Sequence, residues 1–208
     1  MKRGMCIVYE VEGALYVNVT NRCSNRCDFC IRNNGDGAYG SESLWLLREP
    51  SAEEIVEAIS GKGPDNYRET VFCGYGEPSY RLNEIREAAL EIKRRYPNTK
   101  IRINTNGHSS LIHGFDTAPL YGVAFDTVSI SLNTPTAEKY CEICHPVYGN
   151  EAFYALIDFA KNVKKYVQTV LLSVVRETLT EEELLECQKI ADGAGVALKV
   201  RTYIGKED

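Results

Sequence analysis

The sequence has 208 residues, of which 44 % are hydrophobic and 25 % are charged, which excludes an intrinsically disordered or fibrous chain. Its formal net charge of −5 disfavours a protein that grips long nucleic acid through a broad basic surface. No apolar stretch reaches the about 20 residues of a membrane span, and the first residues lack the apolar region of a signal peptide, so we expect a single cytoplasmic domain over residues 1–208.

Runs of apolar or alternating residues predict strands that alternate with amphipathic segments along the chain. The predicted strands span residues 14–20, 70–73, 101–105, 127–133, 169–175 and 196–203. A turn at Glu12-Gly13 predicts a hairpin over residues 6–15, so residues 1–15 form an N-terminal extension to the alternating pattern.

Start and stop signals delimit the predicted helices. Ser51 with Glu54 and Thr180 with Glu183 form capping boxes, and Thr134-Pro135 can open a short helix. Stop signals follow two of the segments, namely Pro97 after residues 84–96, and Gly193 with Gly195 after residues 181–191.

The regular alternation of strand and helix implies a parallel sheet covered by crossover helices. The strand–helix units are too few for a full eight-stranded barrel, which takes about 250 residues. We therefore predict an α/β fold, a partial (β/α)6 TIM-like barrel with a mostly parallel six-stranded sheet.

Polar side chains alternate with apolar ones along four of the predicted strands. Because the apolar set must face the helices, the polar set faces the interior, where an ordinary barrel carries branched aliphatic residues. The polar set is Tyr16, Asn18, Thr20, Arg102, Asn104, Asn106, Ser129, Ser131, Asn133, Lys199, Arg201 and Tyr203. A polar interior implies a bound polar ligand, whereas a solvated sheet face is the alternative. Within this set, we single out as substrate contacts Tyr16, Asn18, Arg201 and Tyr203, for which internal hydrogen bonding is an equal alternative.

Three cysteines follow the strand over residues 14–20. Cys23, Cys27 and Cys30 have the spacing C-x3-C-x2-C on a loop at the carboxyl end of that strand, where the active sites of α/β proteins lie. Three close thiolates suit a soft metal centre, and a four-iron cluster held by only three cysteines keeps one iron free of protein ligands. That iron can bind a substrate.

With Phe29 before its last cysteine, this motif resembles the signature of the radical S-adenosylmethionine (SAM) enzymes. The resemblance implies that Cys23, Cys27 and Cys30 hold a [4Fe-4S] cluster whose open iron chelates SAM, with Phe29 by the adenine. An electron from flavodoxin or ferredoxin would then cleave SAM to a 5′-deoxyadenosyl radical, which abstracts hydrogen from a small-molecule substrate. The protein would position and shield this chemistry.

Later motifs match the same family. Residues 73–78 resemble its GGGEP motif, with Tyr75 in place of the middle glycine. By this resemblance, the methionine end of SAM is expected to lie on Gly74, Tyr75, Gly76 and Glu77. The ribose and carboxylate of SAM are expected to contact Asn106, Ser131 and Asn133, and the carboxylate could also pair with Arg176.

Residues 16–23, 43–46 and 131–140 resemble the short TatD-associated radical SAM proteins, and the chain is also similar to the queuine lyases. Queuine lyases cleave a C–N bond to release 7-aminomethyl-7-deazaguanine. That resemblance implies a deazaguanine that stacks on Tyr75 or Tyr203 and bonds to Asn18 or Asn133. The alternative is radical modification of a peptide or of a nucleic-acid-derived substrate. The oligomeric state stays open.

Two other function classes compete for the thiols. Cys27 and Cys30 could join Cys141 and Cys144 in the zinc site of a non-catalytic binding module, but the 110 residues between the pairs far exceed the about 12 to 20 of zinc modules. A simple electron carrier is disfavoured because a ferredoxin cluster has four cysteine ligands.

The remaining cysteines and histidines fit structural positions. Cys141 and Cys144 have helical spacing and are expected in the core, as is Cys187, whereas Cys6 and Cys73 stay unassigned. The histidines show no metal-ligand spacing and are expected in loops or at the surface, at positions His108, His113 and His145.

Overall fold

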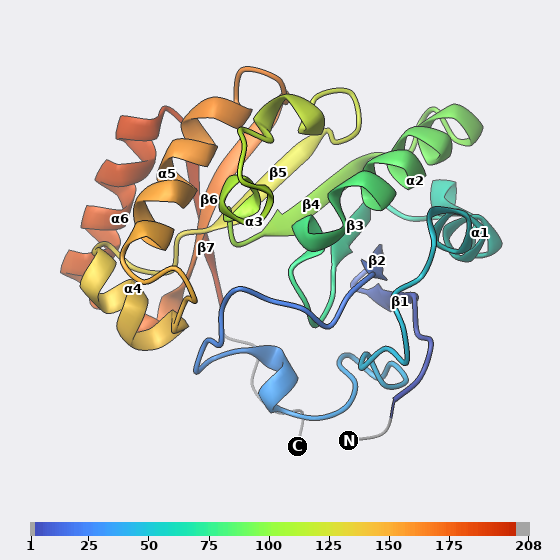
Figure 1. Cartoon of the computed structure of the whole chain (residues 1–208), viewed down its shortest axis with the longest axis horizontal. Coiled ribbons are helices and arrows are strands. Elements are labelled where there is room, and N and C mark those ends of the chain that lie inside the picture. The colour runs from blue at the N-terminus through green and yellow to red at the C-terminus, as the bar shows by residue number, and fades with distance from the viewer. Residues whose placement is uncertain (1–2, 203–208) are drawn as a thin grey trace.

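The computed structural model describes residues 3–202, which form a curved sheet with helices on its outer side (Figure 1). The strands are β1 (Val8–Val11), β2 (Ala14–Asn18), β3 (Thr70–Cys73), β4 (Ile101–Thr105), β5 (Thr127–Ser131), β6 (Thr169–Val175) and β7 (Ala197–Arg201). They lie side by side in chain order, with β1 and β2 antiparallel and every later pair parallel. No pairing joins β1 to β7 among these strands, so the sheet is an open partial barrel and the predicted α/β fold is confirmed.

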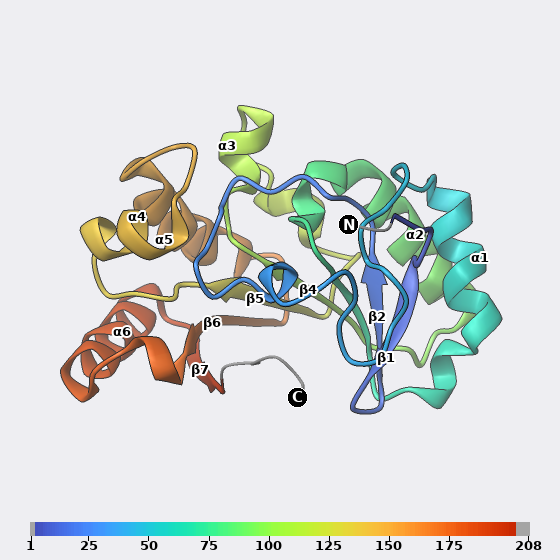
Figure 2. The same ribbon diagram turned by 90° about the horizontal axis from the view of Figure 1, so that it is seen from below.

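The helices connect successive parallel strands. They are α1 (Ala52–Lys62), α2 (Leu82–Arg95), α3 (Ser109–His113), α4 (Ala137–Cys144), α5 (Glu151–Val163) and α6 (Glu181–Ala194). Short 3₁₀ turns complete the connections, namely η1 (Ile31–Asn33), η2 (Pro64–Asn66), η3 (Pro78–Arg81), η4 (Ala118–Tyr121) and η5 (Arg176–Thr178). The long segment 19–50 crosses the side of the sheet away from the helices (Figures 1 and 2).

Local signals account for most element boundaries. Both predicted capping boxes form, at Ser51 and at Thr180. The short helix begins after its N-cap Thr136, two residues later than predicted, and Gly193 lies inside α6, whose C-cap is Gly195. The sheet has seven strands because the predicted N-terminal hairpin adds β1 beside β2.

Apolar residues of the strands pack against the helices as the alternating pattern predicts, for example Leu15 and Val17, which are fully buried. At β7 the pattern fails, because Val200 is 45 % exposed. β7 is the edge strand of the sheet, so Val200 has a neighbouring strand on one side only. Tyr203 lies outside the described residues.

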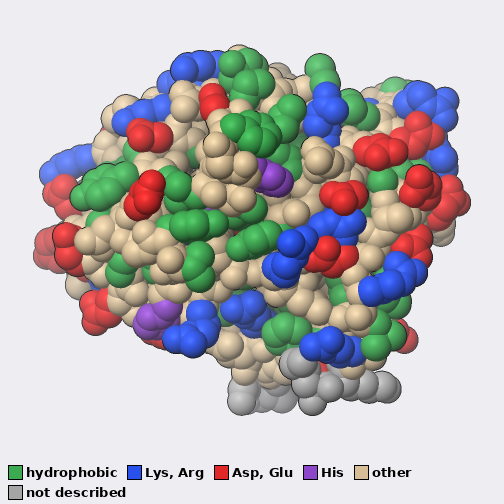
Figure 3. Space-filling model, in the orientation of Figure 1, with side chains coloured by type: hydrophobic (Ala, Val, Ile, Leu, Met, Phe, Trp, Pro, Cys, Tyr) green, Lys and Arg blue, Asp and Glu red, His purple; other side chains and the backbone are tan. Residues whose placement is uncertain are grey.

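The helical face carries both signs of charge. Acidic and basic side chains are interspersed over α1 and α2 in the view of Figure 3. Exposed ion pairs join Glu91 to Arg94 and Arg95 to Glu57. None of the helices within residues 3–202 has the length and apolarity that a membrane crossing requires.

Candidate active site

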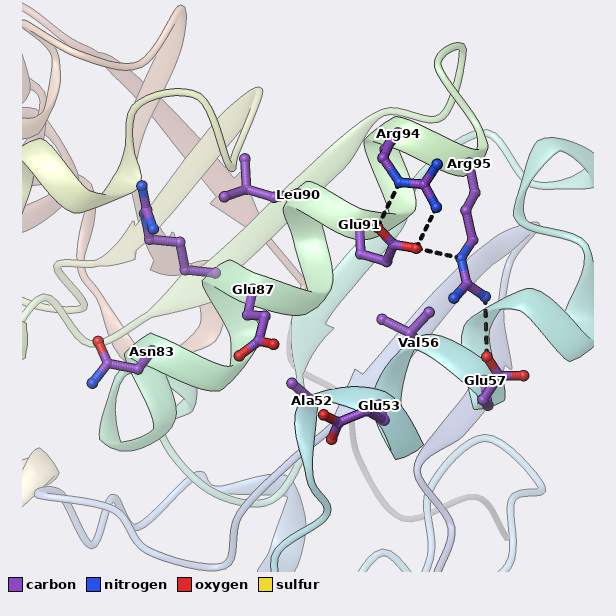
Figure 4. Close-up of a pocket in the computed structure, with 11 residues that line it drawn as sticks. Ala52, Glu53, Val56, Glu57, Asn83, Glu87, Leu90, Glu91, Arg94 and Arg95 are labelled. Carbon is purple, nitrogen blue, oxygen red and sulfur yellow. Dashed lines mark hydrogen bonds and ion pairs between the residues drawn. The ribbon is translucent and has the colours of Figure 1, made fainter.

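The three motif cysteines open into one cavity of about 250 Å³ on the inner side of the sheet. The cavity is also lined by polar residues of the strands or of their carboxyl ends, among them Asn104, Asn106, Ser131, Asn133, Lys199 and Arg201. The predicted polar interior therefore exists. A second hollow, of about 750 Å³, lies on the outer side between α1 and α2 (Figure 4). Its lining contains no thiol and is crossed by the Glu91 and Arg95 ion pairs, so we take the inner cavity as the candidate site.

The cysteine loop is held by backbone hydrogen bonds on two sides. On one side, the amides of Arg26 and Asp28 donate to the carbonyls of Cys144 and Ile143, at 2.9 and 3.0 Å. On the other, the amide of Glu77 donates to the carbonyl of Arg22 at 2.7 Å. The loop is thus fixed both to the end of α4 and to the segment that follows β3.

All three motif thiols are half-buried. Burial raises the pKa of Cys23 to about 12 and also raises the pKa of Cys30. A hydrogen bond with Cys144, together with burial, raises the pKa of Cys27. Thiolate is the form that binds metal, so metal binding at this loop must release protons.

The three thiols lie around one cavity. Within residues 3–202, no group of three or more His, Cys, Asp or Glu side chains could hold one metal ion. A multi-iron cluster is larger than one ion and needs its thiolates spread around it. The donor set of three thiols at the cavity fits a cluster that keeps one iron free of protein ligands, whereas a structural zinc site takes four ligands.

Two glycines let the segment after β3 approach β2 and the residues that lead from β2 into the cysteine loop. A Cβ at Gly76 would lie 2.7 Å from the carbonyl oxygen of Arg22, and a Cβ at Gly74 would lie 2.8 Å from Cγ of Asn18. Gly74 also has a φ of +100°, which disfavours any other residue. Both glycines line the cavity, so their backbone faces a ligand there.

Glu77 ties together the ends of two strands. Its carboxylate accepts hydrogen bonds from Thr105 Oγ1 at 2.6 Å, from the Asn106 amide at 2.7 Å and from the Ser79 amide at 3.0 Å. Burial raises the pKa of this carboxyl, although the hydrogen bonds act in the opposite direction. Glu77 lines the cavity, but its oxygens are largely used by the protein itself.

The side chain of Tyr75 points away from the cavity, so it does not offer the stacking face that was expected for a deazaguanine. Its phenol donates to the carbonyls of Gly35 and Gly37 at 3.0 and 2.9 Å, and its ring packs edge-on against Trp45. With only 3 % of its surface exposed, Tyr75 braces the segment 34–45. The flanking glycines face the cavity while the side chain between them faces the opposite way.

Two further predicted ligand contacts lie elsewhere. Asn18 is fully buried, and its amide nitrogen donates to the carbonyl of Leu44 at 2.8 Å. Arg176 pairs with Glu181 and donates to the carbonyl of Leu179, because the chain turns away from the cavity after β6. Neither residue lines the cavity.

Two buried side-chain oxygens at the cavity wall lack a hydrogen-bond donor within the described residues. Oδ1 of Asn25 and Oδ1 of Asn133 accept no hydrogen bond within the described part of the chain, although both residues line the cavity. A buried acceptor without a donor is costly, so these oxygens fit a ligand that brings hydroxyl or ammonium groups. Asn133 was predicted as a ligand contact; Asn25 was not, because nothing in the cysteine motif indicates which way its amide points.

A buried network supports the cysteine loop from below. His108 Nδ1 lies 3.0 Å from Ser24 Oγ, and its Nε2 lies 3.2 Å from the Tyr140 phenol, which accepts a hydrogen bond from Asn25 Nδ2 at 2.9 Å. Asn106 donates to Ser24 Oγ at 2.8 Å. His108 lies in the loop between β4 and α3, in line with its expected place in a loop or at the surface, but it is fully buried. Its place after β4, beneath the cysteine loop, explains the burial.

Burial lowers the pKa of His108 to about 4, from an ordinary value of 6.5. The unfolded chain therefore binds more protons than the folded one below pH 6.5, so the folded state loses stability as the pH falls from 6.5 towards 4. We expect His108→Gln to remove about 2 kcal/mol of the stability difference between pH 7 and pH 5. Urea unfolding at both pH values measures this, with His145→Gln, a change at an exposed histidine, as the control. An unchanged difference in the His108 variant would contradict the assignment.

The other cysteines are not alike. Cys187 is buried as predicted. Cys144 is buried but also contacts Cys27, and Cys141 is only half-buried and donates to Asn150 Oδ1 at 3.0 Å. Cys73 lines the cavity.

Tyrosines form the wall of the cavity farthest along the sheet from β7. Tyr9 and Tyr16 face each other across the hairpin, with ring centroids 5.5 Å apart. Tyr39 joins them from the segment 34–45. Only Tyr16 was predicted; the register of Tyr9 opposite Tyr16 could have indicated the second, whereas a loop residue such as Tyr39 gives no sequence signal.

Comparison with known proteins identifies a family. The model of the radical SAM superfamily matches residues 17–190. No curated protein matches the sequence.

Solved structures share the fold. Streptococcus suis SuiB bound to precursor peptide SuiA is 17 % identical with a TM-score of 0.66, and the match covers 95 % of this chain and 40 % of SuiB. Native anSMEcpe with AdoMet and the Cp18Cys peptide is 20 % identical with a TM-score of 0.63, covering 92 % and 51 %. Methylornithine synthase (PylB) is 15 % identical with a TM-score of 0.62, covering 93 % and 54 %. The chain thus spans roughly half the length of these proteins.

Proposed function

The chain belongs to the radical SAM superfamily, whose members are enzymes that use a [4Fe-4S] cluster and SAM, and we propose that it abstracts hydrogen from a small-molecule substrate. The observation that supports this most directly is that three thiols, two close-approach glycines and two partnerless buried acceptors line one cavity. When bound, the reduced cluster and SAM supply the 5′-deoxyadenosyl radical that performs the abstraction.

Each role falls to residues at the cavity wall. We assign the iron to Cys23, Cys27 and Cys30. The backbone of Gly74 and Gly76 would receive the SAM ammonium, because both residues line the cavity. The remaining contacts to SAM are assigned to residues that line the cavity, namely Asn25, Phe29, Asn106, Ser131 and Asn133.

The protein must also keep water and oxidants from the radical. The segment 34–45 is braced over the cavity side of the sheet by the Tyr75 phenol, and Tyr39 from this segment lines the cavity. A closed, desolvated site prevents side reactions of reactive intermediates. We propose a cytoplasmic setting, because the thiols bind iron only when they are reduced. We also propose flavodoxin or ferredoxin as the electron donor.

The identity of the substrate is a more specific proposal than the type of reaction. Queuine, cleaved at its C–N bond, is one candidate, supported by the tyrosine wall on which a planar base can stack. Of the contacts first expected for it, Asn133 lines the cavity, whereas Asn18 and Tyr75 do not. The other candidate is a peptide or a nucleic-acid-derived molecule, and both SuiB and anSMEcpe were solved with peptides.

We expect protein reconstituted with iron and sulfide in the absence of air to form 5′-deoxyadenosine from SAM when a reductant is added. Chromatography of the quenched reaction measures this, with protein loaded with zinc alone as the control. Zinc without iron or sulfide in anaerobically purified protein would favour the binding-module alternative. Calorimetry with queuine in the presence of SAM then tests the substrate: heat of binding supports the lyase, and its absence counts against it.

A further inference from the structure

The charged side chains of the cavity that lack a partner within the described residues are basic. Its charged lining residues are Glu77, Arg102, Lys199 and Arg201. Glu77 is engaged by the ends of β3 and β4, as described above, and Arg102 forms a two-point ion pair with Glu69 at 2.9 Å. Within residues 3–202, the side chains of Lys199 and Arg201 form neither a hydrogen bond nor an ion pair, and Arg201 Nε is buried without a partner. Among the residues that the structure describes, two cations therefore face the cavity with no anionic side chain paired to them.

These two residues project on the same side of β7. They are two positions apart on one strand, and both line the cavity, so they form what we call the cationic ledge, Lys199 and Arg201. In the strand register, Lys199 lies beside Ser173 of β6, which lies beside Ser131 of β5. Two hydroxyl residues that also line the cavity thus continue the row from the ledge.

The ledge lies within reach of the aromatic wall. Burial, with Tyr16 and Cys73 adding to it, raises the pKa of Tyr39 to about 12, while the charge of Arg201 acts in the opposite direction. This interaction places the guanidinium within electrostatic range of the phenol. Arg201 and the rings of Tyr9, Tyr16 and Tyr39 line the same cavity, so a ligand that fills it can touch both.

We propose that the cationic ledge binds the oxyanion, a carboxylate or a phosphate, of a substrate whose planar part stacks on the three tyrosines. This inference rests on the proposed function and names its substrate class. A guanidinium presents two parallel N–H donors that match the oxygens of a carboxylate or of a phosphate. Aromatic rings stack on the planar face of any nucleobase. A substrate whose side arm is a cationic amine, as in queuine, would meet two like charges instead.

The test uses reconstituted protein with SAM bound and three probes in calorimetry. Guanosine 5′-monophosphate and guanosine differ only by the phosphate, and benzoate offers a carboxylate on a ring. We expect Arg201→Gln to weaken the binding of guanosine 5′-monophosphate or benzoate at least about tenfold, and Lys199→Gln, at an exposed position, about threefold. Lys189→Gln, an exposed lysine of α6 paired with Glu186, is the matched control and leaves the affinities unchanged. If guanosine 5′-monophosphate binds more tightly than benzoate, the oxyanion is a phosphate, and if benzoate binds more tightly, it is a carboxylate.

Three results would overturn the proposal. The first is that neither guanosine 5′-monophosphate nor benzoate binds. The second is that guanosine binds as tightly as its monophosphate, and that benzoate binds equally well to the wild type and to Arg201→Gln. The third is a tenfold loss of SAM affinity in Arg201→Gln without loss of probe affinity, which would assign the ledge to the cofactor. Formation of 5′-deoxyadenosine by the wild type is measured separately, so failure of the proposed function shows as lost SAM cleavage and not as lost probe binding.

Discussion

Replacement of Cys23, Cys27 and Cys30 together by alanine is expected to abolish iron and sulfide incorporation and the formation of 5′-deoxyadenosine. The three thiols are the only cysteines of the C-x3-C-x2-C loop, and all of them line the cavity. A cluster without its thiolates has no bond to the chain, so the loss should be complete and not graded. Iron and sulfide analysis after anaerobic reconstitution measures it, and circular dichroism verifies that the variant is folded.

Cys144 provides the sharpest control for this experiment. It is buried, contacts Cys27, and is the nearest candidate for a fourth ligand. We expect Cys144→Ala to keep its iron and sulfide, with only a modest loss of stability from the small space that the sulfur leaves. Cys141→Ser, on the same helix and half-buried, serves as the second control. A cluster retained by the triple variant, or lost from Cys144→Ala, would contradict three-cysteine ligation.

Gly76→Ala is expected to have the second-largest effect. The added Cβ would lie 2.7 Å from the carbonyl oxygen of Arg22 and 2.8 Å from the carbonyl carbon of Thr20, and both are backbone atoms next to the cysteine loop. Backbone cannot rotate aside as a side chain can, so the loop must move. We expect a loss of about 2 to 3 kcal/mol in the free energy of unfolding and at least a tenfold loss of SAM affinity. Urea unfolding and calorimetry with SAM measure the two.

Gly61→Ala is the matched control, because it makes the same change inside α1 with no atom within 4 Å of the new Cβ. Alanine is favoured over glycine in a helix by about 0.5 to 1 kcal/mol, so this variant should be slightly more stable and bind SAM normally. If Gly76→Ala binds SAM as the wild type does, the segment after β3 is not the seat of the methionine end.

The fold was predictable because its signals are local. β3, β4 and β6 have the residues that the alternating patterns predict, and the capping boxes at Ser51 and Thr180 depend on two residues each. β5 ends at Ser131, two residues early, since Asn133 adopts a left-handed φ of 63° that no strand pattern reveals.

The sequence predicted those site residues whose positions follow from strand alternation or from motif spacing. Ser131 and Arg201 lie on strands, where alternation sets the direction of a side chain, and both line the cavity. Tyr75 and Arg176 lie on loops and turns, where the direction depends on partners distant in sequence, such as the carbonyl of Gly35 for Tyr75. The buried position of His108 likewise depends on Ser24 and Tyr140, which the sequence does not place together.

We infer that one iron of a cluster held by three cysteines binds the amino and carboxylate groups of SAM. Electron–nuclear double resonance on the reduced, reconstituted protein tests it, with SAM labelled by ¹⁵N at its amino group. We expect a ¹⁵N coupling to the cluster that is absent with unlabelled SAM and lost in the triple cysteine variant. A reduced cluster whose spectrum shows no ¹⁵N coupling, and does not change when saturating SAM is added, would contradict it.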